Sequence, residues 1–105
     1  MSKNTFAYNA VNLDPEIKIT IVAARWNTDL VDALVESATA HLTEIGCKNI
    51  STLYVPGSWE LVHASQNALK DSDGVISFGV VIRGETTHYE LISQTVSQGL
   101  MQISI

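Results

Sequence analysis

The apolar residues in the first part of the chain follow two different patterns, a nearly continuous run and then a helical repeat. Residues 17–24 (IKITIVAA) are rich in β-branched side chains and nearly all apolar after Lys18, which is typical of a central strand in a parallel sheet. A helical period follows, carried by Leu30, Leu34, Ala38, His41/Leu42 and Ile45. Asn27 or Thr28 can cap the start of this helix, and Gly46 suits its C-terminal end. The pattern predicts a strand followed by a helix.

The same order of elements occurs twice more. Residues 50–55 predict a second strand, and residues 60–70 predict a second helix. Residues 74–81 predict a third strand, and Thr87-x-x-Glu90 is a capping box that opens a third helix. One face of that helix carries Tyr89, Ile92, Val96, Leu100 and Ile103. Strands that alternate with helices at this spacing predict a parallel sheet covered by helices.

The length predicts a single α/β domain over residues 1–105, with residues 1–15 as an extended arm. At Ile105 the apolar helical period is still running, without a cap, glycine or proline. Three strands are also fewer than such sheets usually have. We therefore expect a C-terminally shortened version of a larger fold.

Charge and composition exclude several classes of partner. Six basic and eleven acidic residues give a net charge of −5, with no cluster of Lys or Arg, so we expect no nucleic acid partner. No stretch approaches the roughly 18 apolar residues of a membrane-spanning helix, so we expect no membrane. The single Cys47 cannot form an internal disulfide, which fits the reducing cytoplasm.

In open parallel sheets, ligands bind beyond the carboxyl ends of the strands. Three segments follow strands here: residues 25–27, 56–60 and 83–88. Trp26 and Trp59 belong to two of them, and an indole there can stack on a flat heterocycle with about 1–3 kcal/mol. The alternative is that either Trp covers the edge of the sheet.

Glu60 has two interpretations. It begins a predicted helix, where a carboxylate interacts favourably with the helix dipole, or it accepts hydrogen bonds from a polyol. Glu60-x-x-His63 also has the ligand spacing of di-metal helical bundles. The motif occurs once and the fold is different, so we expect no metal.

The third segment combines an anion site with a base. Residues 84–87 precede a helix, where free backbone N–H groups and the Thr86 hydroxyl can bind an anion. His88 stands in the first turn, where the dipole favours the neutral imidazole near pH 7. A neutral imidazole beside a phosphate is suited to general acid–base catalysis. Ordinary capping is the alternative.

The same segments carry a resemblance to a known family. Residues 55–61 (VPGSWEL) and 79–90 (GVVIRGETTHYE) resemble the two signature segments of the lumazine synthases. Arg25-Trp26-Asn27 resembles the Arg-aromatic-Asn that follows the first strand in that family. The resemblance runs from about Ile17 to the end of the chain. Val62 stands where the family usually has Pro.

The resemblance implies a flavodoxin-like three-layer α/β/α fold with a parallel sheet, here lacking the family's last strand and helices. It implies a homo-oligomer, either a pentamer or an icosahedral shell. It also implies condensation of 5-amino-6-ribitylaminouracil with 3,4-dihydroxy-2-butanone 4-phosphate in riboflavin biosynthesis, a transferase reaction that uses no cofactor.

The resemblance further implies a role for each site residue. Trp26 stacks on the pyrimidine, and Ser58, Trp59 and Glu60 hold the ring and the ribityl chain. The backbone of Val80, Val81 and Ile82 binds the uracil edge. Glu85 and Thr86 bind the phosphate, and His88 carries the proton.

Two alternatives stay open. A homologue that forms shells or binds flavin without turnover is one, because the family's C-terminal phosphate-binding region is missing. A generic flavodoxin-like binding module is the other, and the specific segment through His88 argues against it.

Overall fold

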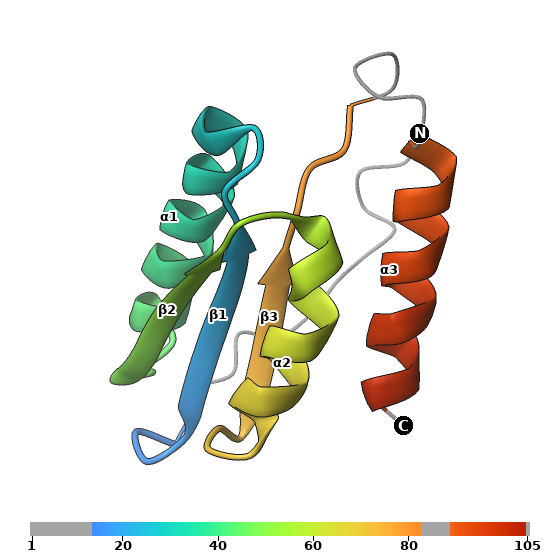
Figure 1. Cartoon of the computed structure of the whole chain (residues 1–105). Helices are drawn as coiled ribbons and strands as arrows, with labels where there is room; N and C mark the ends of the chain where they lie inside the picture. The colour runs from blue at the N-terminus through green and yellow to red at the C-terminus, as the bar shows by residue number, and fades with distance from the viewer. Residues whose placement is uncertain (1–13, 83–88, 105) are drawn as a thin grey trace, which may run out of the picture.

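The computed structural model describes residues 14–82 and 89–104 and contains a small sheet with helices on both faces (Figure 1). The elements in chain order are β1 (Lys18–Ala24), α1 (Thr28–Glu44), β2 (Asn49–Val55), the 3-10 helix η1 (Ser58–Glu60), α2 (Leu61–Leu69), β3 (Gly74–Phe78) and α3 (Tyr89–Ser104). The predicted alternation of strands and helices is confirmed. None of the described helices has the length and apolar character needed to cross a membrane.

All the strands of this sheet are parallel, in the order β2-β1-β3. In the register, Ile21 of β1 lies opposite Thr52 of β2 and Ile76 of β3. This arrangement confirms the flavodoxin-like α/β fold expected from the resemblance. It also directs the carboxyl ends of the three strands to the same edge of the sheet.

The apolar run of β1 is explained by burial on both faces. Ile21 and Ala23 face the core under α1, whereas Val22 and Ala24 face the core under α2 and α3. All four have no exposed surface. A strand covered on both sides needs apolar residues at successive positions, as β1 has from Ile21 to Ala24.

The buried face of α1 lies one residue away from the face that the leucines indicated. Leu30 and Leu34 are exposed, whereas Val31 and Val35 are buried together with Leu42. The prediction was wrong at these two leucines. Val35 is one helical turn after Val31, and Leu42 is two turns after Val35, so all three lie on the same side of the helix.

The C-terminal end of α1 follows the predicted glycine motif. Gly46 has a positive φ of 101°, which glycine adopts without steric cost. The N–H of Gly46 donates to the carbonyl of Thr43, and the N–H of Cys47 donates to the carbonyl of Leu42. This pair of hydrogen bonds is a Schellman motif, which turns the chain toward β2.

The opposite face of the sheet is covered by α2 and α3 (Figure 1). Leu61 and Val96 are buried there against β1 and β2. The two helices approach closely at Gly99, since a Cβ on this residue would lie only 2.7 Å from Cγ2 of Val62. This second core completes the layered arrangement.

Two predicted boundaries change. The third strand was predicted over 74–81, but β3 ends at Phe78, whose partner on β1 is Ala23. Beyond Ala24 the first strand turns toward α1, so residues 80 and 81 have no residue of β1 to pair with on that side. The helix predicted over 60–70 is α2 from Leu61 to Leu69, preceded by η1, so Glu60 belongs to η1.

Candidate functional site

The three strand ends enclose a cavity of about 210 Å³. Its walls come from the segments after β1, β2 and β3, together with one residue of α3. The lining residues are Trp26, Gly57, Ser58, Trp59, Val81, Ile82 and Ile92. The structure therefore brings together five of the residues that the sequence assigned to the site, from three separate loops.

The two tryptophans stand at the mouth of this cavity. Trp26 is 63% exposed and Trp59 is 48% exposed, so neither covers the edge of the sheet as a buried plug. Val81 and Ile82 supply half-buried aliphatic surface to the same cavity. Apolar walls with exposed indoles at the opening suit the faces of a flat ring system.

The turn that carries Trp26 is fixed by hydrogen bonds on both of its sides. The N–H of Arg25 donates to the carbonyl of Val55 over 2.8 Å, and the Thr28 hydroxyl donates to the carbonyl of Arg25 over 2.8 Å. Asn27 has a left-handed backbone conformation and starts α1, but its side chain makes no capping hydrogen bond. Its amide Nδ2 instead donates to the carbonyl of Val80 over 3.0 Å.

The charge of Arg25 lies beside Tyr54, outside the set of residues that line the cavity. Its guanidinium carbon is 4.9 Å from the centre of the Tyr54 ring, a cation–π arrangement. The Tyr54 hydroxyl donates to Oδ1 of Asp32 over 3.3 Å. Desolvation and the Asp32 carboxylate raise the pKa of the Tyr54 phenol, while Arg25 lowers it.

Glu60 lies next to the cavity but does not line it. Its side chain is exposed and extends over Gly57, where a Cβ would be 3.3 Å from its Oε1. Because Gly57 is part of the wall, this carboxylate is close to the opening. Val80 is also half-buried beside the lining, with its side chain packed on the α1 side of the sheet.

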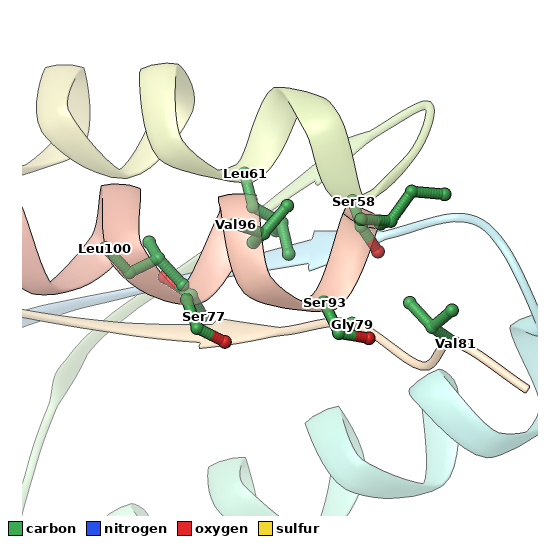
Figure 2. A pocket seen from close by; sticks show the side chains of 10 residues that line it. Ser58, Leu61, Ser77, Gly79, Val81, Ser93, Val96 and Leu100 are labelled. Atoms are coloured by element: carbon green, nitrogen blue, oxygen red, sulfur yellow. The ribbon is translucent and has the colours of Figure 1, made fainter. Parts of the chain in front are cut away.

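A second cavity of about 250 Å³ continues from the first, between β3 and α3 (Figure 2). The two cavities share Ser58, Val81 and Ile92. Gly79 allows this segment to approach η1, since a Cβ there would lie 2.9 Å from Leu61 Cδ1 and 3.0 Å from the Ser58 hydroxyl. Hydroxyl groups of four serines border the second cavity: Ser58, Ser77, Ser93 and Ser97.

Three predicted site residues lie outside the described part of the chain: Glu85, Thr86 and His88. Ile82, the last described residue before them, lines the cavity. Among residues 14–82 and 89–104, no three His, Cys, Asp or Glu side chains are grouped as metal ligands would be. His63, considered as a possible ligand, instead pairs its Nε2 with Nδ2 of Asn67 over 3.1 Å.

Sequence reasoning missed three contributions to the site. Gly57 and Ile92 line the cavity, and Asn27 joins two of its walls. Ile92 was expected on the apolar face of the last helix, and Asn27 was expected as a cap. Their places at the site depend on how α3 and the β3 loop pack, which local patterns do not report.

Comparisons with known proteins agree with this arrangement. Residues 16–105 match the family model described as 6,7-dimethyl-8-ribityllumazine synthase. A protein of that name from Streptomyces avermitilis is 40% identical over 91 residues, which cover 86% of this chain and 56% of the relative. The Schizosaccharomyces pombe protein of the same name is 40% identical over 96 residues, covering 87% of this chain and 60% of the relative.

A third relative with this name, from Arthrobacter, is 38% identical over 90 residues. Its match covers 86% of this chain and 56% of the relative, so the chain spans little more than half the length of the curated relatives that it matches. The family model covers nearly the whole chain, including all three loops that form the cavity. By these matches, the chain belongs to the 6,7-dimethyl-8-ribityllumazine synthase family.

Proposed function

We propose that this protein is a transferase of riboflavin biosynthesis that forms 6,7-dimethyl-8-ribityllumazine. The substrates are 5-amino-6-ribitylaminouracil and 3,4-dihydroxy-2-butanone 4-phosphate. One observation carries the proposal: the cavity at the strand ends gathers Trp26, Ser58, Trp59, Val81 and Ile82, which the family signature assigns to substrate binding. The match of residues 16–105 to the family model supports the same assignment.

The first cavity takes the pyrimidine in this proposal. Trp26 stacks on the ring, and Val81 and Ile82 contact it along the opposite wall. Residues 79–82 follow the last paired residue of β3, so the sheet ladder does not use their backbone groups. The backbone of Val80, Val81 and Ile82 then binds the polar edge of the uracil. Stacking on an aromatic side chain contributes about 1–3 kcal/mol per base.

The ribityl chain extends from the ring toward Ser58, Trp59 and Glu60. The Ser58 hydroxyl borders both cavities, and the Glu60 carboxylate lies over the neighbouring Gly57. A carboxylate accepts hydrogen bonds from hydroxyl groups and is stronger in this role than a neutral acceptor. This pair therefore favours a polyol substituent over an apolar one.

The chemistry is assigned to the segment after Ile82. The backbone N–H groups of Glu85 and Thr86 and the hydroxyl of Thr86 bind the phosphate, and His88 transfers protons. The amine of the pyrimidine attacks the ketone and loses water to form a Schiff base. Elimination of phosphate leaves an enol, which tautomerises to a ketone. The ribityl-bearing nitrogen attacks this ketone and closes the ring with loss of another water. General acid–base catalysis of such steps contributes about 10²- to 10⁴-fold.

We further propose that the protein acts in the cytoplasm as a homo-oligomer, a pentamer or an icosahedral shell. Leu53 is 46% exposed on β2, an edge strand of the described sheet, and Leu91 and Met101 are exposed on α3. Exposed apolar side chains on an edge strand and a helix favour association. Light scattering after size-exclusion chromatography gives the mass, and a monomer contradicts the oligomer.

A condensation assay tests the proposed function. The purified protein is mixed with both substrates, and lumazine absorbance is followed against a mixture without protein. The His88→Ala variant is expected to retain product formation at a rate reduced by about 10²- to 10⁴-fold. His41→Ala, an exposed position on α1, is the matched control and keeps the wild-type rate.

The outcomes separate the alternatives. Product formation by wild-type protein at only the protein-free rate contradicts the proposed activity. Tight binding of lumazine or riboflavin without turnover then identifies a non-catalytic binding homologue. Equal rates for the wild type and His88→Ala remove His88 from the mechanism while leaving the activity in place.

A further inference from the structure

The function proposed above uses the backbone of Val80 but gives no role to the hydrogen bond that the Val80 carbonyl accepts from Asn27. Asn27 Nδ2 donates to the Val80 carbonyl over 3.0 Å. Trp26, the residue before Asn27, and Val81, the residue after Val80, both line the cavity. The hydrogen bond therefore joins two walls of the cavity, one residue away from the lining on each side.

The backbone of Asn27 is arranged for this contact. Its φ of 57° and ψ of 55° make it the only non-glycine residue with positive φ among residues 14–82 and 89–104. Asn is one of the few side chains that adopt this region readily. At the N-cap of a helix a side-chain capping hydrogen bond is usual, yet Asn27, the N-cap of α1, directs its amide to Val80 instead.

The other side of the same turn is fixed to β2. The Arg25 N–H donates to the carbonyl of Val55, two residues before the cavity residue Gly57. Trp26 stands between these two attachments and is largely exposed. The Cα from which its indole projects is thus placed relative to the Val81–Ile82 wall by the backbone at residues 25–27.

We propose, on the basis of the proposed function, that Asn27 is a positioning residue for the aromatic ring of the substrate. Its amide sets the separation between Trp26 and the Val81–Ile82 wall, and so the width of the space that receives the flat ring. Asn27 acts through these neighbours and does not touch the reacting atoms. Its loss weakens ring binding and leaves the chemistry of bound substrates nearly unchanged.

Two variants test this with different backbone effects. Asn27→Asp keeps the size and the tolerance of positive φ, but a carboxylate cannot donate to a carbonyl. Asn27→Gly removes the amide and keeps the backbone conformation free of strain. Asn49→Asp is the matched control. It removes the hydrogen bond that the Asn49 side-chain amide donates to the Pro15 carbonyl over 3.4 Å, at the start of β2 and at the other end of the sheet.

The assays are product binding, followed by quenching of tryptophan fluorescence with 6,7-dimethyl-8-ribityllumazine, and steady-state kinetics. Asn27→Asp is expected to raise the Kd and the KM for the pyrimidine about tenfold, and Asn27→Gly about fourfold, with kcat within about twofold. Asn49→Asp stays within about twofold of wild type. Unchanged Kd values in both Asn27 variants, or a loss in kcat alone, overturn the proposal.

A ligand-independent assay separates this inference from the proposed function. The chain has two tryptophans, so a Trp59→Phe background leaves Trp26 as the only indole. Adding Asn27→Asp is expected to increase the nanosecond motion of Trp26 in time-resolved fluorescence anisotropy, with the circular dichroism of the fold retained. An unchanged anisotropy decay overturns the role of Asn27. A wild type that neither binds nor forms lumazine overturns the proposed function instead.

Discussion

The contact between α2 and α3 at Gly99 sets up two opposing effects of a single methyl group. Gly99→Ala improves helix propensity by about 0.8–1.0 kcal/mol. The new Cβ would lie 2.7 Å from Val62 Cγ2 and 3.1 Å from Cγ1. Val strongly prefers one rotamer in a helix, so Val62 cannot turn both methyl groups away without cost. Overpacking of this kind costs about 1–3 kcal/mol.

We therefore expect Gly99→Ala to destabilise the protein by about 1 kcal/mol, since the steric cost exceeds the gain in propensity. This lowers the Tm by about 4 °C for a domain of this size. Val62→Ala removes the opposing methyl groups, and in that background Gly99→Ala becomes stabilising. The double-mutant cycle then shows a favourable coupling of about 1–2 kcal/mol.

Thermal unfolding followed by circular dichroism measures this cycle, at one protein concentration because association shifts the Tm. Gln98→Ala, at an exposed position of the same helix, controls for the effect of alanine on α3. If Gly99→Ala stabilises the protein equally with Val and with Ala at position 62, propensity alone decides and the reasoning from close packing is refuted.

Three further changes have defined outcomes. Trp26→Ala weakens lumazine binding by about 1–3 kcal/mol in calorimetry, while Trp26→Phe keeps most of the affinity, and equal affinity of all three proteins contradicts stacking. Ser65 is 2% exposed and its hydroxyl lies 2.6 Å from that of Ser77, so Ser65→Ala costs about 1–3 kcal/mol in urea unfolding. Replacing both serines with Ala costs less than the sum of the single changes, whereas additive losses argue against the pair. Asp32→Asn lowers the pKa of Tyr54, seen as a shift in tyrosinate absorbance, because the carboxylate helps to raise that pKa. The stability that the protonated Tyr54 phenol contributes is present below its ordinary pKa of 10.0 and is lost as pH rises through the raised pKa. If Tyr54 titrates in Asp32→Asn as it does in the wild type, Asp32 does not help to raise this pKa.

The order and type of the elements could be predicted because burial on two faces leaves a clear signature in the sequence. The strand β1 is apolar at successive positions, and Gly46 ends α1 with the backbone geometry that glycine allows. The choice between two neighbouring stripes on α1 failed because both have helical spacing. Only the packing against the sheet places Val31 inside and Leu30 outside.

The candidate site was predictable to the extent that it follows from topology. Parallel strands send their loops to one edge, so Trp26 and Trp59 were expected near one another, and the cavity contains both. Ile82, which also lines the cavity, was expected at the site only from the family resemblance. The hydrogen bond between the Asn27 amide and the Val80 carbonyl was not predictable. It depends on the left-handed backbone of Asn27 and on the course of the segment after β3, which is distant in the sequence. The roles of Glu85, Thr86 and His88, outside the described residues, stay predictions.

The strand order also has a consequence for biosynthesis. The middle strand of the described sheet is made before both of its neighbours, and Ile19 pairs with Gly74, which is synthesised much later. While the chain emerges from the ribosome, one edge of this apolar strand stays unpaired, and such edges promote aggregation. Nascent chains that are arrested before Gly74 are therefore expected to bind chaperones that recognise extended apolar segments.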